Sequence, residues 1–263
     1  MYKQWLVPAY LEIPAEFPMA STCLQLSVTN HATAHTLTVV SNLKKTMEIP
    51  KYTEKQGIID ITAPKFLWKY QTINKYSLAN LSNQKMWASE PEAFNDPFEF
   101  TFQSSGNGEF KELFEKAKKS KVVCMTDNPK NILMWSHYGN FHKGMCLGFE
   151  NRTHTIPINY SNDFPIIDFT DKDEQQKILE FAKIMTTKSS QWSYENERRM
   201  IFIPQMNNAV EYPGELKFVN FGIKTSDEDI EKVQKAINDE SVVYLKSIHN
   251  PKEYQLDWTE LVE

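Results

Sequence analysis

Two carboxylates placed two residues apart are the feature of this sequence best suited to chemistry. They lie in the segment Gln191-Trp-Ser-Tyr-Glu-Asn-Glu-Arg-Arg-Met200. Because side chains alternate along a strand, a strand here would direct Glu195, Glu197 and Arg199 to one face. Its other face would carry Trp192, Tyr194, Arg198 and Met200. Carboxylates about 7 Å apart repel each other unless a cation or a polyhydroxyl ligand lies between them. The segment therefore predicts a binding site, and the alternative is a surface strand whose Glu and Arg side chains pair.

A second group of candidate residues lies in the loop 90–100. Asn95 and Asp96 can bond their own backbone, and Pro97 keeps Asp96 out of the helical region. A rigid loop of this kind can present Asn95, Asp96 and Glu99 to a ligand. The same residues would also serve as a purely structural turn.

A third group is an aromatic stripe on a helix expected from Asn128 to about Phe141. The stripe consists of Trp135, Tyr138, Gly139 and His142, at i, i+3, i+4 and i+7, with His137 beside it. A glycine in such a stripe allows another part of the chain to approach closely. The hydroxyl, indole and imidazole groups each need a partner, so the helix is either a pocket wall or a fully satisfied core helix.

Hydrophobic periodicity predicts the elements that must position these residues. Helices are expected at 74–83, 109–120, 128–141, 173–186 and 226–237, and strands at 66–70, 86–89, 121–125, 145–149, 156–160, 191–200, 216–222, 242–245 and within 253–263. The strand-helix-strand order near the end favours a parallel pair of strands. Residues 65–263 are thus predicted to form an α+β domain, with a mixed β-sheet flanked by helices and carrying the site.

Residues 1–64 differ from the rest of the chain. Two Thr/Val/Leu-rich runs, 22–29 and 35–41, surround a polar turn and predict a β-hairpin. We expect a β-rich N-terminal extension or small module, which would offer a surface for a protein partner.

Length, charge and cysteine content limit the function classes. A chain of 263 residues can bury a sizeable core without help. A net charge of -5 argues against a general nucleic-acid or membrane-surface binder, although it leaves room for a local basic groove. Cys23, Cys124 and Cys146 form neither an even set nor a metal spacing, which favours reduced thiols and a cytoplasmic location. No apolar run approaches the ~20 residues that cross a bilayer, so no membrane association is expected.

Four segments taken together resemble the bacterial family catalogued as domain of unknown function 2971. They are Trp68-Lys-Tyr70; Met86-Trp-Ala-Ser with Phe94-Asn-Asp-Pro-Phe-Glu99; Leu133-Met-Trp-Ser-His-Tyr-Gly139 with His142-Lys-Gly-Met-Cys-Leu-Gly-Phe149; and Trp192-Ser-Tyr-Glu-Asn-Glu-Arg198. The resemblance covers about residues 66–256, and the family name carries no activity.

The order of these parts is also distantly similar to that of ADP-ribosyltransferases, which split NAD and pass ADP-ribose to a protein or nucleic acid. That resemblance implies NAD as substrate, no metal, and an ADP-ribosyltransferase-like fold. It implies a catalytic set of Glu197, Glu195, Tyr138 and His137, in which Glu197 stabilises the oxocarbenium-like sugar and Glu195 orients the acceptor. It implies a binding set of Lys69, Tyr70, Ser89, Asn95, Asp96, Glu99, Trp135, His142, Tyr194 and Arg198. The early strand carries Lys69 where that superfamily has His or Arg, and no Ser-Thr-Ser follows.

Further expectations follow from the same resemblance. With eight glycines and no glycine-rich fingerprint, any pyrophosphate contact would fall to Lys69, Arg198 or Arg199. Bacterial effector domains of this kind act as toxins or in phage defence, which makes these the expected roles.

Two other function classes fit the same residues. A metal-dependent nuclease or phosphodiesterase would gather Asp96, Glu99, Glu195 and Glu197 around Mg²⁺, and a chelator would abolish its activity. A non-enzymatic module would use the acidic and aromatic residues to clamp a ligand or partner, without turnover.

Overall fold

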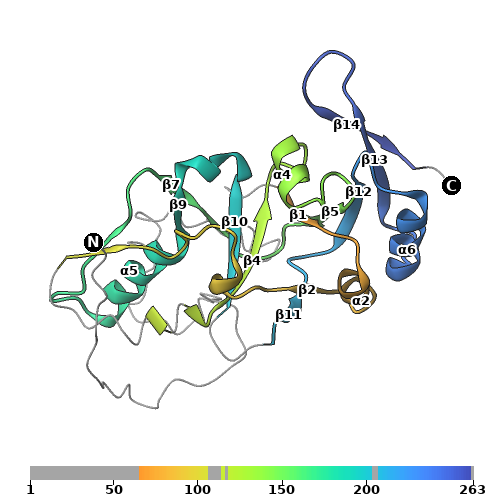
Figure 1. Ribbon diagram of the computed structural model, residues 1–263. Helices are drawn as coiled ribbons and strands as arrows, with labels where there is room; N and C mark the ends of the chain where they lie inside the picture. Colours follow the sequence, from red (N-terminus) through yellow and green to blue (C-terminus); the bar gives the residue numbers. More distant parts are fainter. Residues whose placement is uncertain (1–64, 106–113, 116–117, 203–206, 262–263) are drawn as a thin grey trace.

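The computed structural model describes residues 65–105, 114–115, 118–202 and 207–261. The hairpin predicted within residues 1–64, and most of the helix predicted at 109–120, lie outside the described residues. Within the described part the chain is α+β, as predicted (Figure 1).

An eight-stranded mixed sheet forms the centre of the fold (Figure 1). Its order is β14 (Leu256–Glu260), β13 (Val243–His249), β12 (Leu216–Phe221), β5 (Met145–Glu150), β1 (Phe66–Gln71), β4 (Lys121–Thr126), β10 (Glu197–Phe202) and β6 (Ile156–Pro157). Its strand pairs are antiparallel except β12 and β13, which are parallel and connected through α6 (Asp227–Ile237). The predicted parallel pair is therefore confirmed.

Shorter elements complete the described chain. The other helices are α2 (Lys75–Ser82), η1 (Pro91–Ala93), α4 (Ile132–His137), α5 (Glu174–Thr186) and η2 (Ser190–Glu195). Three two-stranded sheets pair β2 (Lys85–Trp87) with β11 (Ala209–Glu211), β3 (Gln103–Ser104) with β8 (Ile166–Ile167), and β7 (Asn159–Ser161) with β9 (Thr187–Ser189). The strand expected at 156–160 is thus divided between β6 and β7.

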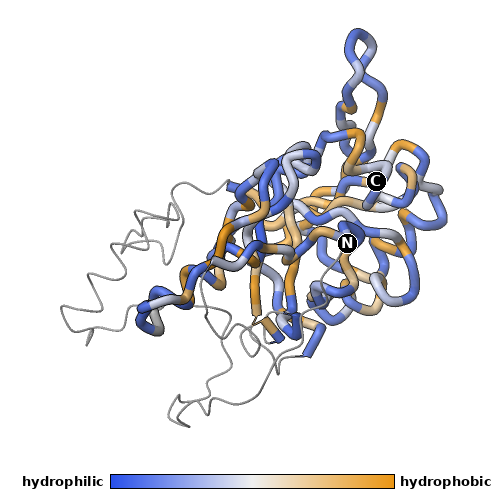
Figure 2. Tube along the Cα trace, turned by 60° about the vertical axis from the view of Figure 1, so that its left-hand side comes forward, coloured by the Kyte–Doolittle hydropathy of each residue, from blue (hydrophilic) through white to orange (hydrophobic). Residues whose placement is uncertain are grey.

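Helices cover both faces of the sheet because its strands alternate between two apolar sides. On β4, Val123 and Met125 join a core with α2 and α6, whereas Val122 joins a core with α5. On β1, Leu67 faces the first of these cores, and Trp68 packs in a third core with α4 and β14. Figure 2 shows hydrophobic segments concentrated along the central strands.

The sheet opens between β1 and β4. These strands share a single register pair, Trp68 with Thr126, although β1 pairs with β5 along its whole length. Further along the same edge of β4, Val122 exchanges both backbone hydrogen bonds with Ser89. Between these two points, the Lys69 ammonium donates to the carbonyl oxygen of Cys124 at 3.2 Å. A side chain thus replaces strand pairing here, and a cavity lies in the opening.

The helix predicted from Asn128 is shorter than expected. It begins at Ile132, because the Asn131 side chain accepts hydrogen bonds from the backbone of Leu133 and Met134. It ends at His137, and three residues soon after it, 140–142, have positive φ angles of 49, 54 and 68°. The aromatic residues therefore do not form one helical stripe.

Candidate functional site

The two carboxylates of the central segment meet through a turn. Residues 190–195 form η2, so the strand prediction for that stretch is wrong. Asn196 follows in the left-handed region, with φ 44° and ψ 50°, and β10 begins at Glu197. Glu195 and Glu197 therefore do reach one site, as predicted. The turn at Asn196 brings them together, and not the alternation of side chains along a single strand. Within β10 the alternation holds, because Glu197 and Arg199 contact each other.

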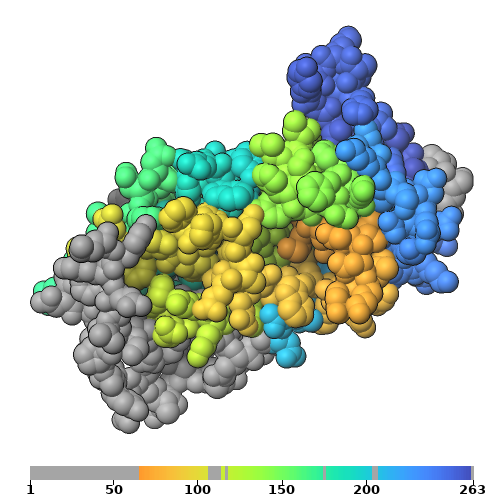
Figure 3. Space-filling view, in the orientation of Figure 1, coloured from red at the N-terminus to blue at the C-terminus, as the bar shows by residue number. Residues whose placement is uncertain are grey.

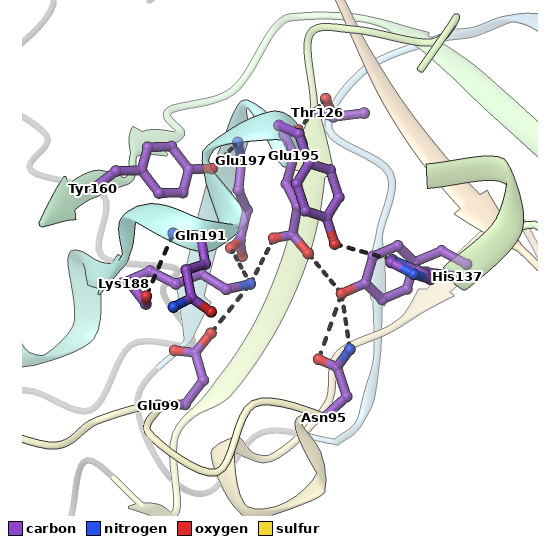
Figure 4. A network of polar contacts seen from close by, with 12 residues as sticks. Asn95, Glu99, Thr126, His137, Tyr160, Lys188, Gln191, Glu195 and Glu197 are labelled. Carbon is purple, nitrogen blue, oxygen red and sulfur yellow. Dashed lines mark hydrogen bonds and ion pairs between the residues drawn. The ribbon is translucent and has the colours of Figure 1, made fainter. Parts of the chain in front are cut away.

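A lysine that sequence reasoning missed lies between the carboxylates. The Lys188 ammonium is 2.5 Å from Glu195 Oε2, 3.2 Å from Glu197 Oε2 and 3.3 Å from Glu99 Oε1 (Figure 4). Its side chain is only 5% exposed, and it stands on β9, whose backbone is fixed by pairing with β7. Lys188 is therefore the cation that the repulsion between the carboxylates requires. Nothing in its sequence context distinguishes it from a surface lysine.

Arg199 is the second cation of the cluster, and it is fully buried. Its Nε lies 2.6 Å from Glu197 Oε1, and its Nη2 lies 3.0 Å from Glu197 Oε2 and 2.8 Å from Glu99 Oε1. A bidentate pair of this geometry fixes the Glu197 carboxylate. With Glu99, Glu195, Glu197, Lys188 and Arg199 all ionised, the cluster carries one net negative charge.

The two neighbouring carboxylates differ in pKa. Burial alone would raise the pKa of Glu197, but Arg199 and Lys188 outweigh burial and lower this pKa to about 2. For Glu195, burial and the neighbouring charge of Glu197 together raise the pKa by more than Lys188 and Tyr138 lower it. Two carboxyl groups with separated pKa values in one cavity are typical of sites that do chemistry.

Glu195 also accepts a hydrogen bond from a phenol. The Tyr138 hydroxyl donates to Glu195 Oε1 at 2.6 Å, and Asn95 Nδ2 lies 3.1 Å from the Tyr138 oxygen (Figure 4). Burial and the Glu195 charge raise the pKa of Tyr138, so the phenol keeps its proton. Thr126 Oγ1 donates to the Glu195 backbone carbonyl at 2.6 Å, which fixes the end of η2.

These residues line a cavity of about 260 Å³ in the opening between β1 and β4. Of the residues predicted from sequence, it brings together Lys69, Tyr70, Ser89, Asn95, Glu99, Tyr138, Glu195 and Glu197. Ser89 reaches it through its bridge to Val122, and Lys69 through its bond to Cys124. Burial lowers the pKa of the Lys69 ammonium, against the opposing effects of Cys124 and Glu197.

Three predicted residues are buried in structural roles outside the cavity lining. Asp96 Oδ1 accepts from the Phe98 amide at 2.9 Å and forms the predicted turn. Trp135 is fully buried, with its indole donating to the Pro129 carbonyl, and a Cβ at Gly139 would lie 2.6 Å from its ring. Arg198 points away from Glu197.

The guanidinium of Arg198 binds Thr155, with Nε 2.9 Å from the hydroxyl and Nη2 3.0 Å from the carbonyl oxygen. The prediction that Arg198 lines the same site as Glu197 is therefore wrong, because neighbouring residues of a strand face opposite sides.

The remaining predicted residues lie near the cavity or in a different one. His137 Nδ1 is 2.9 Å from the Tyr194 hydroxyl, and Tyr138 joins this pair to the cavity because its ring contacts that of His137. His142 is on the other side of α4, where its ring stacks on Trp135 and lines a second cavity.

Comparison with known proteins covers part of this site. Residues 134–200 match the model of a family described as Protein of unknown function (DUF2971). This segment is similar to that family. It contains five residues that line the cavity, Met134, Tyr138, Lys188, Glu195 and Glu197. No curated protein and no solved structure matches the chain.

Two features of the described residues concern metal binding and membrane spans. Among them, no group of three or more His, Cys, Asp or Glu side chains is arranged to hold a metal ion. Glu99, Glu195 and Glu197 do converge, but on the ammonium of Lys188. The described helices include none with the length and hydropathy needed to cross a bilayer.

Proposed function

We propose that the protein cleaves the bond between nicotinamide and ribose in NAD and transfers ADP-ribose to a protein or nucleic-acid acceptor. The observation that carries this proposal is the position of Glu195. Its carboxylate lies on the wall of a cavity, and one of its oxygens is bound by the Tyr138 phenol. A ribose hydroxyl can take the place of a neutral phenol donor, whereas it would compete poorly with a guanidinium.

The chemistry requires a negative charge beside the sugar. When the glycosidic C–N bond breaks, its electron pair moves to the nicotinamide nitrogen and leaves a positive, oxocarbenium-like ribose. A preorganised carboxylate lowers the energy of that state. The acceptor then forms a bond to the same carbon and gives up a proton.

The contacts of Glu197 and Glu195 favour different roles from those that the sequence suggested for these two residues. Both oxygens of Glu197 are bound by Arg199, and one of them also by Lys188. We therefore assign the contact with ribose to Glu195, and to Glu197 the placement of Lys188 and Arg199. Tyr138 holds Glu195 in place until a ribose hydroxyl replaces it. His137 with Tyr194 stands where an acceptor would approach.

The size of the cavity limits which part of NAD it encloses. At about 260 Å³ it lies just below the range of ~300–1,000 Å³ typical of small-molecule pockets. It therefore suits the nicotinamide and its ribose, and the remainder of NAD would extend beyond it. Of the three cations considered for the pyrophosphate, Lys69 lines the cavity, whereas Arg198 and Arg199 are buried in other contacts. Loss of cellular NAD or modification of a host molecule would make the protein a toxin or a phage-defence effector.

The test is release of nicotinamide, followed by proton NMR in the presence of EDTA. Glu195→Gln keeps the shape of the side chain, and Lys188 keeps Glu99 and Glu197 as partners. We expect this variant to lose roughly 10²-fold or more of the rate, the usual effect of removing one preorganised electrostatic group. Glu231→Gln, an exposed change on α6, is the matched control and should leave the rate unchanged.

Two results would refute the proposal. One is the absence of turnover by the wild type in extracts that offer protein and nucleic-acid acceptors. The other is nicotinamide release by Glu195→Gln at the wild-type rate. Glu197→Gln is a poorer test, because it removes the main partner of a buried guanidinium and is expected to cost about 3–5 kcal/mol of stability.

A metal-dependent phosphodiesterase is the second candidate, favoured by the convergence of Glu99, Glu195 and Glu197. Mg²⁺ prefers such oxygen ligands. It would have to displace the Lys188 ammonium, which already contacts all three carboxylates. Cleavage of nucleic acid that needs Mg²⁺ and stops with EDTA would support this candidate, since NAD cleavage should persist in EDTA.

A further inference from the structure

A second and larger cavity lies on the other side of α4. Its volume is about 730 Å³, and it is bounded by α4, the loop after β12 and the loop that joins β13 to β14. The loop between β13 and β14 projects from the molecule beside α4 (Figures 1 and 3). Its lining includes Leu133 and Ser136 of α4, together with Lys224, His249, Lys252 and Tyr254.

Basic groups from separate segments gather in this cavity. Lys224 follows β12, His249 ends β13, and Lys252 lies in the loop beyond. Glu253 is the one acidic side chain among the described lining residues. The concentration is local, because the whole chain has a net charge of -5. A negative net charge does not exclude a local basic groove of this kind. Such a groove favours an anionic ligand.

The imidazole of His142 lies among these basic groups. Burial lowers the pKa of this imidazole, and the charges of Lys224 and His249 lower it further. His142 Nε2 lies 3.1 Å from Ser136 Oγ, while its Nδ1 is buried without a hydrogen-bond partner. A proton on Nδ1 would be buried unpaired, so the ring is neutral and carries its hydrogen on Nε2.

This tautomer argues for binding and against catalysis in the second cavity. The Nε2 hydrogen points at Ser136 Oγ, and the Ser136 hydroxyl lies 3.0 Å from the Ile132 carbonyl oxygen, to which it donates. The imidazole therefore cannot take a proton from the serine, and Ser136 is not an activated nucleophile. The pair forms a fixed polar wall.

Aromatic and apolar side chains stand beside the basic groups. Tyr254 is 102% exposed, Ile132 is 41% exposed and Leu133 is 44% exposed. Positive charge combined with an exposed aromatic ring is the arrangement that binds single-stranded nucleic acid, because phosphates pair with the cations and a base stacks on the ring. An acidic peptide would use the charges but would leave the tyrosine without a stacking partner.

The two cavities share α4 as a common wall. Met134 and Tyr138 line the first cavity, and Leu133 and Ser136 line the second. A helix is about 10–12 Å across with its side chains. A strand held in the second cavity would therefore lie about one helix diameter, roughly 10–12 Å, from the first cavity.

We infer that the second cavity binds single-stranded nucleic acid and that this strand is the acceptor for ADP-ribose. Lys224, His249 and Lys252 contact its phosphates, and Tyr254 stacks on a base. The acceptor role rests on the proposed NAD cleavage, whereas the binding itself does not.

Binding is measured first, by fluorescence anisotropy of a short labelled oligothymidylate with no NAD present. We expect wild-type binding that weakens with salt, and a Lys224→Ala/Lys252→Ala variant that binds roughly tenfold or more weakly and with a smaller salt slope. Tyr254→Ala should weaken binding by a factor of about 5 or more, the lower end of the effect of losing one stacked base. Lys217→Ala/Lys235→Ala, which changes two lysines outside the cavity, is the matched control and should bind as the wild type does.

The outcomes separate the inference from the proposed function. Glu195→Gln should bind the strand normally and transfer ADP-ribose to it roughly 10²-fold or more slowly than the wild type. Nicotinamide release by the wild type without strand binding, or equal binding of an acidic peptide, would overturn the inference and leave NAD cleavage intact. Strand binding without nicotinamide release would support the site while refuting the proposed reaction.

Discussion

Glu195 and Glu197 show how surroundings separate two residues of the same type. Glu197 has a guanidinium across both of its oxygens, whereas Glu195 has an ammonium on one and a phenol on the other. The first carboxylate is held ionised, and the second is the easier of the two to protonate. If Glu195 must be ionised to stabilise the sugar cation, activity falls as pH falls through its raised pKa.

Tyr138→Phe tests this dependence. The change removes the O–H that donates to Glu195, and a lost hydrogen bond to a carboxylate raises the carboxyl pKa. The acidic limb of kcat/KM for NAD cleavage should therefore move to higher pH, by roughly 1 unit for a bond worth about 1–1.5 kcal/mol. The measurement is the pH profile of the rate in the two proteins.

Tyr194→Phe is the control for that profile. Its hydroxyl contacts His137 Nδ1 and does not touch Glu195, so the acidic limb should stay where it is in the wild type. An unmoved limb in Tyr138→Phe would mean that the limb belongs to a different group.

At the scale of elements, Asn196 decides how the two carboxylates meet. It is exposed and stands in the left-handed region between η2 and β10. Asn196→Gly should leave the free energy of unfolding within a few tenths of a kcal/mol, because glycine adopts this conformation freely. Asn196→Val should lower it by about 1–2 kcal/mol and reduce NAD cleavage, because a β-branched residue resists that conformation. Denaturant unfolding and nicotinamide release measure the two effects, and equal behaviour of the Gly and Val variants would contradict this account.

The same residue explains where sequence reasoning succeeded and failed. Alternating polarity correctly predicted β10, with Glu197 and Arg199 on one face. It could not predict η2, because the turn depends on a positive φ at Asn196 that asparagine tolerates without requiring. The helix from Asn128 was predicted too long for a similar reason, since Asn131 is an equally good cap and competes for the first turn.

Site residues could be predicted where their types and their spacing in the sequence are unusual. Carboxylates, a tyrosine and an asparagine in unusual spacing pointed to Glu195, Tyr138 and Asn95, and the cavity brings them together. Lys188 was not predictable, because its importance comes from three carboxylates that approach it from two other elements and a loop. The failure of Arg198 has a different origin. Strand alternation already directed it to the face opposite Glu197, and it entered the predicted binding set only through the resemblance to ADP-ribosyltransferases.

At the scale of the whole molecule, the cavity exists because the central sheet is incomplete. One register pair joins β1 to β4, and the Lys69 ammonium bonds the Cys124 carbonyl where further strand pairing would lie. This arrangement replaces backbone pairing with a partly buried cation, which is unfavourable for folding. Under the proposed function, that cation would serve to bind the pyrophosphate of NAD.

The variant Lys69→Met tests whether the buried ammonium lowers the stability of the fold while serving the site. Burial lowers the pKa of Lys69 in the folded protein, so below the unfolded value the ammonium reduces stability. Methionine should therefore raise the free energy of unfolding at pH 7 while NAD cleavage falls. The difference between variant and wild type should shrink as pH rises toward about 10.4, where the unfolded lysine also loses its proton. Urea unfolding at pH 7 and 10 tests this, with exposed Lys235→Met as the control. A destabilised Lys69→Met would show instead that the bond to Cys124 holds the two halves of the sheet together.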